Sequence, residues 1–349
     1  MSYKNIYILG VGGSGMSSIA KYLKQKGDNV IGYDQRKSYV TNLLNQDGIK
    51  VVHTLDEITY KPESLYIYSS AIPIESDRFE DFYDKENVLS RPEYLKNLSE
   101  NHKIIGITGT HGKTSTTALL SHIFHFNNVN VSYLYGGITT FNGIGGHYGD
   151  PDQPLILETD EAFNTFEKIK ISDLLVLNVD SDHLDYFKNL DNYKDAFYKV
   201  MKNVTDNLVI NNDDLNIKSM KELKNPVSYG KDIAADFKVQ SPGTFIYENN
   251  KYEIKSDIIG DHFKANMLGA IILALLNGIE IKDSLNAIES FAGVKRRIEL
   301  IGISKGVLIY DDYGHHPTEM EATITALKQQ TESKLYVVFQ PHRYTRTME

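Results

Sequence analysis

The sequence predicts an α/β protein of two or three domains. Twice along the chain, around residues 5–23 and again around residues 104–126, a short apolar run leads into a glycine-rich turn and then into apolar residues at helical spacing. Strands that alternate with helices in this way build largely parallel sheets. The length of 349 residues allows more than one such sheet.

The composition excludes several classes of protein. Hydrophobic residues make up 41% and charged residues 24%, as in ordinary globular proteins, and the net charge of −9 argues against a nucleic-acid scaffold. There is no cysteine, so disulfides and thiolate chemistry are excluded. The first residues lack the apolar core of a signal peptide, and the longest apolar run, residues 267–279, is too short to span a bilayer. We expect a cytoplasmic protein with no membrane or nucleic-acid partner, either a monomer or a homodimer.

The first glycine-rich turn has the spacing G-x-G-x-x-G and follows a predicted strand at residues 5–9. A second predicted strand, residues 29–32, leads to Asp34, about 20 residues beyond the turn, where an acid often bonds a ribose hydroxyl. This context favours a nucleotide, and a UDP-sugar would use the same glycines as a dinucleotide. A tight turn with a solvated Asp34 is the alternative. The candidate residues of the turn are Gly10, Gly12, Gly13, Ser14 and Gly15.

A third predicted strand, residues 65–68, delivers Ser69 and Ser70 at its carboxyl end, where open α/β sheets bind ligands. Arg91 begins another predicted helix. Either the serines and Arg91 contact a ligand, or they shape a turn and provide a surface charge. The polar residues 98–102 then indicate a boundary, so residues 1–100 are expected to form the first domain.

The second glycine-rich turn has the form of a phosphate-binding loop between a strand at residues 104–107 and a helix at residues 115–126. Lys113 would reach the outer phosphates and the Thr114 hydroxyl would ligate Mg²⁺. The first glycine of the strict pattern is replaced by Ile107, and an ordinary turn with a solvated lysine is the alternative. The candidate nucleotide-binding residues are Thr108, Gly109, Thr110, His111, Gly112, Lys113, Thr114 and Ser115.

Acidic clusters follow the next two predicted strands, residues 154–157 and 174–177. Glu158 and His183 lie at the same sheet edge as the phosphate loop and are candidate ligands of a Mg²⁺ ion between nucleotide and acceptor. Solvated loop acids are the alternative, and a zinc site is less favoured. Before these strands, the glycines of residues 136–150 predict a flexible loop that either faces substrate or lies on the surface.

The rest of the second domain, which we bound at residues 101–297, offers two further groups. A helix is predicted at residues 191–204, and short strands follow through 206–259. His262 and Asn266 lie four residues apart at the start of an apolar helix and either contact adenine or are polar residues of the helix start. Arg297 ends a basic loop that either neutralises phosphates or is a solvated linker.

Residues 298–349 predict a βαβ piece, with strands at 307–310 and 335–339 and a helix at 318–329. About 50 residues cannot cover both faces of a parallel sheet. We therefore expect an incomplete third domain, or one that docks on the second. Its polar candidates are Asp312, Tyr313, His315, Arg343 and Arg346.

Six ordered motifs across the whole chain resemble those of the Mur ligases. They are residues 10–16, 108–114, 180–185, 293–297, 311–319 and 340–347. The family's phosphate loop also lacks the first glycine. The resemblance implies a Rossmann-like first domain, a central ATPase-like α/β domain with a phosphate loop, and the start of a Rossmann-like third domain.

The resemblance also implies an ATP-dependent ligase of peptidoglycan precursor synthesis, and the motifs are most similar to those of the members that add L-alanine to UDP-N-acetylmuramate. A carboxylate is a poor electrophile until ATP phosphorylates it, and Mg²⁺ with cationic side chains would offset the charge of two polyanions. The family's third domain continues for about another hundred residues, so a truncated chain is expected.

Residue by residue, the resemblance implies these roles. The first glycine turn, Ser70 and Arg91 would hold the UDP-sugar. Lys113 would bind the outer phosphates, and Thr114, Glu158 and His183 would ligate metal. His262 and Asn266 would contact adenine, and Arg297 would face the phosphates. Asp312, Tyr313, His315, Arg343 and Arg346 would bind ATP and position L-alanine.

Three alternatives remain. A recycling ligase that attaches a tripeptide to the same sugar nucleotide shares the first two domains. A truncated chain would also serve as a nucleotide-binding module without catalysis. A nicotinamide oxidoreductase would explain the first glycine turn but not the phosphate loop.

Overall fold

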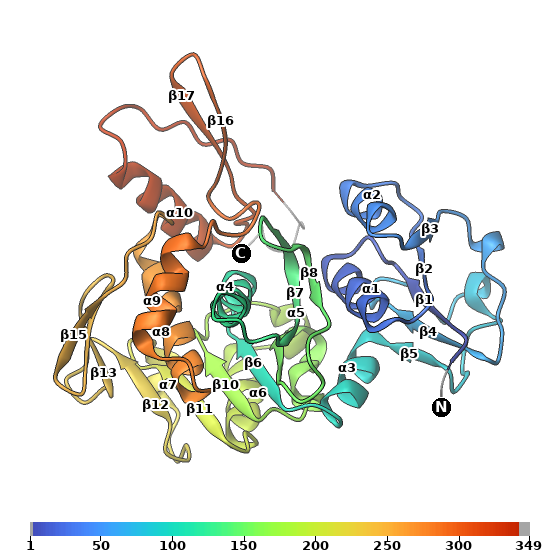
Figure 1. Cartoon of the computed structure of the whole chain (residues 1–349), viewed down its shortest axis with the longest axis horizontal. Coiled ribbons are helices and arrows are strands. Elements are labelled where there is room, and N and C mark those ends of the chain that lie inside the picture. Colours follow the sequence, from blue (N-terminus) through green and yellow to red (C-terminus); the bar gives the residue numbers. More distant parts are fainter. Residues whose placement is uncertain (1–2, 342–349) are drawn as a thin grey trace.

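The computed structural model describes residues 3–341, which form three sheets (Figure 1). The amino-terminal sheet is parallel, with strand order β3-β2-β1-β4-β5. Its strands are β1 (Asn5–Leu9), β2 (Val30–Tyr33), β3 (Lys50–Val52), β4 (Ser64–Tyr68) and β5 (Val88–Ser90). The helices of this domain are α1 (Ser14–Lys26), α2 (Tyr39–Gln46) and α3 (Arg91–Ser99), with the 3-10 turns η1 (Leu55–Glu57) and η2 (Asp77–Phe79).

Local sequence explains where these helices begin and end. Gly27 adopts a left-handed φ of 98° after α1, and its N–H bonds to the carbonyl of Leu23. Ser90 and Glu93 form a capping box at the start of α3, where Pro92 occupies the first turn. These elements confirm the predicted fold class of the first domain.

The central domain contains a ten-stranded mixed sheet in the order β15-β14-β13-β12-β11-β10-β6-β9-β7-β8. Its strands are β6 (Ile104–Thr108), β7 (Ser132–Thr139), β8 (Gly143–His147), β9 (Leu155–Glu158), β10 (Asp173–Val176), β11 (Asn207–Asn211), β12 (Val227–Gly230), β13 (Phe237–Ser241), β14 (Thr244–Tyr247) and β15 (Asn250–Glu253). Its helices are α4 (Lys113–Phe126), α5 (Leu184–Phe187), α6 (Leu190–Lys202), α7 (Leu215–Ser219), α8 (Asp261–Leu276) and α9 (Ile281–Ser290), with the 3-10 turns η3 (Ala162–Asn164) and η4 (Phe166–Lys168).

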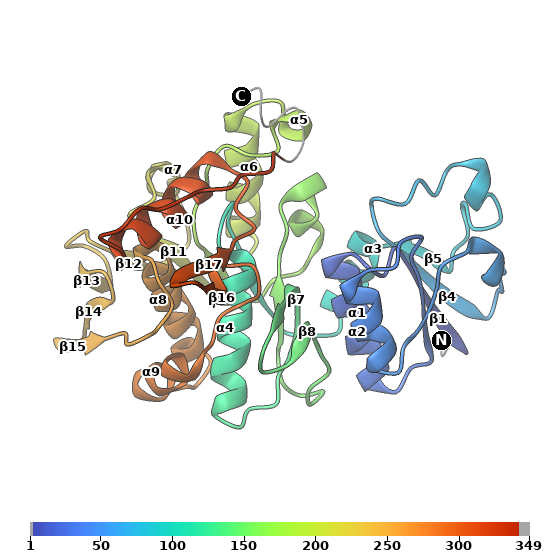
Figure 2. The same ribbon diagram turned by 90° about the horizontal axis from the view of Figure 1, so that it is seen from above.

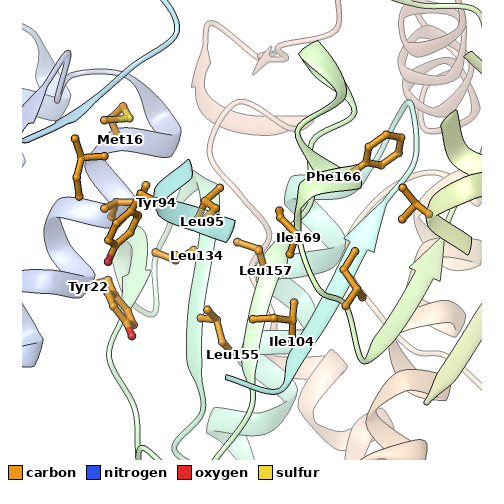
Figure 3. Close-up of a cluster of buried hydrophobic side chains, with 14 of the residues drawn as sticks. Met16, Tyr22, Tyr94, Leu95, Ile104, Leu134, Leu155, Leu157, Phe166 and Ile169 are labelled. Carbon is orange, nitrogen blue, oxygen red and sulfur yellow. The ribbon is translucent and has the colours of Figure 1, made fainter. Parts of the chain in front are cut away.

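Alternate residues of the central strands point to two different cores. Ile105 and Ile107 of β6 pack with α4, α8 and α9. Ile104 faces the other way, into a core that includes α6 and also α1 and α3 of the first domain. Figure 3 shows this second core, where Tyr22 and Leu95 lie against side chains of the central sheet. The first domain therefore shares a hydrophobic core with the central one.

The prediction of a flexible loop at residues 136–150 was wrong. These residues form the hairpin of β7 and β8, which faces α1 (Figure 2). A Cβ atom on Gly146 would lie 2.0 Å from the Ser18 carbonyl oxygen, so only glycine permits this approach. Lys21 of α1 donates hydrogen bonds to the carbonyls of Asn142 and Ile144. Gly146 therefore serves close packing between two domains.

The third segment contains an antiparallel hairpin of β16 (Glu299–Ser304) and β17 (Val307–Asp311), followed by α10 (Pro317–Gln329). The prediction of a βαβ piece was wrong, because residues 335–339 form no strand. Within the described residues no strand supplies backbone partners to them, and Val338 is 99% exposed. No helix in the described part of the chain is long and apolar enough to cross a membrane.

Candidate active site

The phosphate loop joins β6 to α4 and depends on two glycines. Gly109 and Gly112 adopt positive φ angles of 143° and 87°. A Cβ on Gly109 would lie 3.1 Å from the backbone of Asn178, and one on Gly112 would lie 2.4 Å from Asn266 Nδ2. Gly112 caps α4 without a side-chain hydrogen bond, so the first N–H groups of the helix face the site. Such a helix start attracts anions.

Lys113 is held by protein oxygens in this structure. Its Nζ donates to Gly109 O at 2.6 Å and to Thr110 O at 3.1 Å, and it pairs with Glu161 at 2.8 Å. Burial raises the pKa of Glu161 to about 7 despite the nearby Lys113 charge. Burial opposes the charge of Lys113 as well and is the largest single influence on it, but the carboxylates of Glu161, Asp160 and Glu158 together raise the pKa of the lysine. The two groups therefore stabilise each other's charged forms.

Glu161 was missed as a candidate residue. It belongs to the acidic cluster after β9, from which the sequence singled out Glu158. Its carboxylate also lies 3.4 Å from the Tyr193 hydroxyl and 3.8 Å from His183 Nε2. The signal was present in the cluster, but nothing in the spacing tells which acid faces the lysine.

Thr114 and Glu158 meet at the start of α4. The Thr114 hydroxyl donates to Glu158 Oε1 at 2.7 Å, and Glu158 Oε2 accepts the Gly136 N–H at 2.6 Å. A hydroxyl and a carboxylate oxygen beside a phosphate loop are ligands that Mg²⁺ prefers. His183 lies nearer to Glu161 and Asp182, 3.8 Å and 3.7 Å from their carboxylates, and has a left-handed φ of 54°.

The third segment docks on the phosphate loop through polar contacts. His111 Nε2 lies 3.2 Å from Asp180 Oδ2, and its Nδ1 lies 3.3 Å from Glu319 Oε1 of α10. Thr318 also donates to Asp180, at 2.7 Å. Burial alone would raise the pKa of Glu319, but the bond with His111 and the charge of Arg297 lower it to about 2. An anionic Glu319 is therefore part of this contact.

A cavity of about 430 Å³ lies beside this contact. It brings together predicted residues from three parts of the chain, with side chains from the phosphate loop, α8 and the third segment. The predicted residues on its wall are His111, Gly112, Ser115, His262, Asn266, Arg297 and Asp312. Burial lowers the pKa of His262, which favours its neutral ring. A flat heteroaromatic ring is a suitable occupant, because neutral imidazole and amide groups can hydrogen-bond its edge.

A second cavity, of about 520 Å³, lies between the first glycine turn and the central domain. Arg91 reaches into it beside Gly15, where a Cβ would lie 2.8 Å from the guanidinium Nε. Among the described residues, that Nε is a buried donor without a hydrogen-bond partner. The predicted residues on its wall are Gly13, Ser14, Gly15, Ser70, Arg91 and Glu158.

Asp34 has a different position from these residues. It accepts the N–H of Gly12 at 2.8 Å and of Arg36 at 2.9 Å, and it does not line the 520 Å³ cavity. A Cβ on Gly12 would lie 2.7 Å from its carboxylate. Asp34 thus closes the glycine turn in this structure. Gly10, with a positive φ of 79°, also shapes the turn.

A third cavity, of about 640 Å³, joins the two domains to the third segment. Ser14 of the glycine turn, Thr114 of the phosphate loop and Tyr313 all line it. The guanidinium of Arg297 lies 5.3 Å from the Tyr313 ring centre. His315 lies just outside, with Nδ1 3.1 Å from the Tyr313 carbonyl oxygen.

Two predicted residues, Arg343 and Arg346, lie outside the described residues. Thr108 and Thr110 are buried in the loop base, where Thr110 bonds the Tyr193 hydroxyl at 3.0 Å. Six other predicted residues line none of the three cavities: Gly10, Asp34, Gly109, Lys113, His183 and His315.

Comparison with known proteins agrees with this arrangement. The chain matches three family models: the Mur ligase family catalytic domain over residues 5–103, the Mur ligase middle domain over 107–274, and the Mur ligase glutamate ligase domain over 296–348. It is 36% identical to the UDP-N-acetylmuramate–L-alanine ligase of Clostridium botulinum (strain Langeland) and 34% identical to that of Dictyoglomus turgidum. Both matches cover 99% of this chain and 78% of the relative.

Solved structures show the same likeness. The UDP-N-acetylmuramate-alanine ligase of Thermotoga maritima superposes with a TM-score of 0.81 at 25% identity, covering 94% of this chain and 78% of that one. A tripeptide-type ligase from Neisseria meningitides, at 23% identity and a TM-score of 0.72 over 84% of this chain and 100% of that one, shares the fold. Family models, curated relatives and fold agree from one end of the chain to the other, and the chain belongs to the Mur ligase family.

Proposed function

We propose that the chain joins L-alanine to UDP-N-acetylmuramate at the expense of ATP and forms UDP-N-acetylmuramoyl-L-alanine, ADP and phosphate for peptidoglycan precursor synthesis. One observation carries the proposal in the structure. Glu158 lines both the 520 Å³ cavity beside the glycine turn and the 640 Å³ cavity that reaches Thr114 of the phosphate loop. A sugar nucleotide held by the first domain would therefore present its carboxylate to the phosphate loop. The curated relatives support the choice of amino acid.

The chemistry has two steps. A carboxylate oxygen of the sugar attacks the γ-phosphorus of ATP, the bond to the bridging oxygen breaks, and ADP leaves with an acyl phosphate behind. The amine of L-alanine then attacks the carbonyl carbon, phosphate leaves, and the nitrogen loses a proton. Activation is needed because a free carboxylate is a poor electrophile. Positioning and charge stabilisation are the contributions expected from the protein.

Lys113 and the start of α4 would hold the outer phosphates of ATP. In this structure the Lys113 ammonium donates hydrogen bonds to Glu161 and to two backbone carbonyls. A bound phosphate would replace these groups as the hydrogen-bond partners of Lys113. Arg297 would add positive charge from the adjoining loop, and His262 and Asn266 would contact adenine in the 430 Å³ cavity. Members of the family are ATP-dependent ligases, which supports this assignment.

Mg²⁺ is proposed as the metal, with Thr114 and Glu158 as ligands of a first ion and His183 as a ligand of a second. Their hydroxyl and carboxylate oxygens fit its preference for oxygen donors that complete their shell with phosphate and water. Once bound, the ion would neutralise the charge of the transferred phosphoryl group.

The division of labour among domains is also a proposal. Residues 1–100 would bind the UDP-sugar through the glycine turn, Ser70 and Arg91, and residues 101–297 would bind ATP. Residues 298–349 would contribute Asp312, Tyr313, His315, Arg343 and Arg346 to the nucleotide and L-alanine sites. We place the reaction in the cytoplasm.

A coupled phosphate-release assay tests the proposal. The chain is supplied with UDP-N-acetylmuramate, ATP and Mg²⁺, and then with L-alanine, with the tripeptide L-alanyl-γ-D-glutamyl-meso-diaminopimelate, or with no amine. L-Alanine should trigger phosphate release, and mass spectrometry should show the alanyl product. Release with the tripeptide alone would assign the chain to recycling. Binding of both nucleotides without release under any condition would make it a binding module.

A further inference from the structure

We propose that His111, Asp180 and His316 form a binding site for a borderline divalent transition-metal ion such as Zn²⁺. Each residue offers one ligand atom, and these atoms lie within 4.8 Å of one another. His111 belongs to the phosphate loop, Asp180 follows β10, and His316 precedes α10. An ion at this place would tie the third segment to the central domain. The site shares no residue with the proposed Mg²⁺ ligands.

The His111 ring is oriented as a metal ligand would need. Its Nδ1 lies 3.3 Å from the Glu319 carboxylate, which can hold the far side of the ring in place. Its Nε2 forms a hydrogen bond of 3.2 Å with Asp180 Oδ2, and a metal ion would replace the hydrogen that these two atoms share. A carboxylate that supports the far nitrogen of a histidine is a regular feature of zinc sites, because it fixes the ring and makes it more basic.

Hydrogen bonds to both carboxylate oxygens also fix the position of Asp180. Its Oδ1 accepts the Ser181 N–H at 2.8 Å, and its Oδ2 accepts the Thr318 hydroxyl at 2.7 Å. The same Oδ2 faces both imidazoles, with His316 Nδ1 at 3.9 Å. This carboxylate oxygen and the two histidine nitrogens come from different parts of the chain and could surround one ion.

His316 requires a small adjustment. Its Nε2 donates to the Ser181 carbonyl at 3.0 Å, so the lone pair resides on Nδ1. That nitrogen accepts the Thr318 N–H at 3.3 Å, a long bond that a metal would replace. Zinc ligands lie about 2.0–2.1 Å from the ion, so the three atoms must draw closer than their present spread. Rotation of the His316 side chain can supply this movement.

The donor set selects the class of metal. Two imidazoles and one carboxylate suit Zn²⁺ and its neighbours in the first transition row, whereas Mg²⁺ prefers oxygen ligands. Three protein ligands would leave a fourth position for water. His111 and Asp180 also line the 430 Å³ cavity, so an ion there would stand at its wall beside the docked third segment.

Metal titration of the full chain without nucleotide tests the site. Co²⁺ serves as the first probe, because a tetrahedral Co²⁺ site absorbs visible light, and Zn²⁺ is then added to displace it. We expect one tight site in the parent chain. His111→Asn, Asp180→Asn and His316→Asn should each weaken Co²⁺ binding by more than about tenfold, since loss of even a supporting residue costs that much.

Two control variants separate this site from others. His102→Asn removes an imidazole that bonds the Leu98 carbonyl and does not belong to the cluster, so it should leave the Co²⁺ spectrum unchanged. His183→Asn tests the proposed Mg²⁺ site and should also retain the spectrum. Parent-like binding in the three ligand variants, or its loss in His183→Asn alone, would overturn the proposal.

A measurement on the parent chain guards against variants that fail to fold. Amide hydrogen exchange is compared with and without Zn²⁺. A metal that joins His316 to the phosphate loop should slow exchange in α10 and in the loop after β10. If Zn²⁺ leaves the exchange rates of α10 and of the loop after β10 unaltered, the proposal that the metal joins these two elements is contradicted. None of these readouts requires turnover, so their outcome is independent of the proposed ligase activity.

Discussion

Lys113 and Glu161 form a buried ion pair at the base of the phosphate loop. Either group alone would be costly to bury, because the interior stabilises an unpaired charge poorly. The pair is therefore tied to the occupancy of the loop: a phosphate that binds Lys113 must compete with Glu161 and two backbone carbonyls. Nucleotide binding would therefore exchange the hydrogen-bond partners of the Lys113 ammonium group.

The first prediction concerns Lys113→Ala. Turnover should fall by about a hundredfold or more, because a positioned charge on the transferred phosphoryl group is lost. The affinity for UDP-N-acetylmuramate should stay within a few-fold, since the glycine turn and Arg91 belong to another domain. Phosphate release and calorimetry measure the two effects. A comparable loss of sugar-nucleotide affinity would contradict the assignment of the two sites to separate domains.

A second prediction concerns pH and His122. Burial lowers the pKa of this histidine, whose Nε2 lies near the Ala287 carbonyl and the Ser290 hydroxyl. The unfolded chain takes up a proton near pH 6.5, while the folded chain resists it. Stability is thus full above that pH and declines as the pH falls toward the lower folded pKa.

In His122→Phe this contribution disappears. Urea unfolding at pH 7.5 and pH 5.5 should show a smaller loss of stability in the variant than in the parent, since Phe141 and Phe291 offer the new ring an aromatic setting. His125→Phe on the same helix is the control. Equal pH dependence in parent and His122→Phe would show that His122 titrates normally.

The sequence predicts the core of the site because local motifs specify it. Lys113, Thr114 and the glycines of the loop follow from a strand, a turn and a helix start that adjoin in sequence. Glu161 and Glu319 could not be found in this way, since their partners, Lys113 and His111, are set by how β9 and α10 pack against the loop. Asp34 has the predicted spacing, but in this structure it closes its own turn.

Among elements, the contact between α1 and the hairpin of β7 and β8 couples the first two domains. Gly146 allows the Ser18 carbonyl to approach the strand, and Lys21 satisfies carbonyls at the hairpin end. The prediction of a flexible loop at residues 136–150 was wrong because glycines are as typical of close backbone packing as of mobile loops. The strand predicted at residues 335–339 failed for another reason: an apolar run of strand length forms a strand only beside a partner.

Gly146→Ala tests this contact. The new methyl would clash with the Ser18 carbonyl, so α1 and β8 must separate, at a cost of about 1–3 kcal/mol or more. Gly302→Ala makes the same change where nothing lies within 4 Å of the added atom, and it should be nearly neutral. Thermal unfolding compares the two. Similar melting temperatures would mean that the hairpin and helix do not pack tightly in solution.

For the whole molecule, the core that contains Tyr22, Leu95 and Leu157 runs without a break from the first domain into the central sheet (Figure 3). The first two domains should therefore unfold together. The third segment, by contrast, meets the central domain through the polar contacts of Thr318 with Asp180 and of Glu319 with His111. Among the described residues, Ile298 and Ala326 are its buried apolar side chains, far fewer than the first domain contributes to its shared core. The third segment is therefore the part expected to move during catalysis.

Leu157→Ala tests the shared core. Truncation of this buried side chain should lower the free energy of unfolding by about 2–5 kcal/mol. Both domains should lose stability to the same extent. Hydrogen exchange of β1 and β10 during urea unfolding reads each domain separately. Leu215→Ala is the matched control, because that leucine is 81% exposed. Protection that falls in β10 but persists in β1 would show that the domains unfold independently.

The split between cores also has a consequence for synthesis on the ribosome. On one face of the amino-terminal sheet, Tyr7, Tyr66 and Phe82 pack against one another in a core of their own. This core can form once about the first quarter of the chain has left the ribosome. The side of α1 that meets β7 and β8 must wait until the hairpin is made. A nascent chain paused between these points would expose the apolar surface of α1, and that interval is when chaperones would be expected to bind.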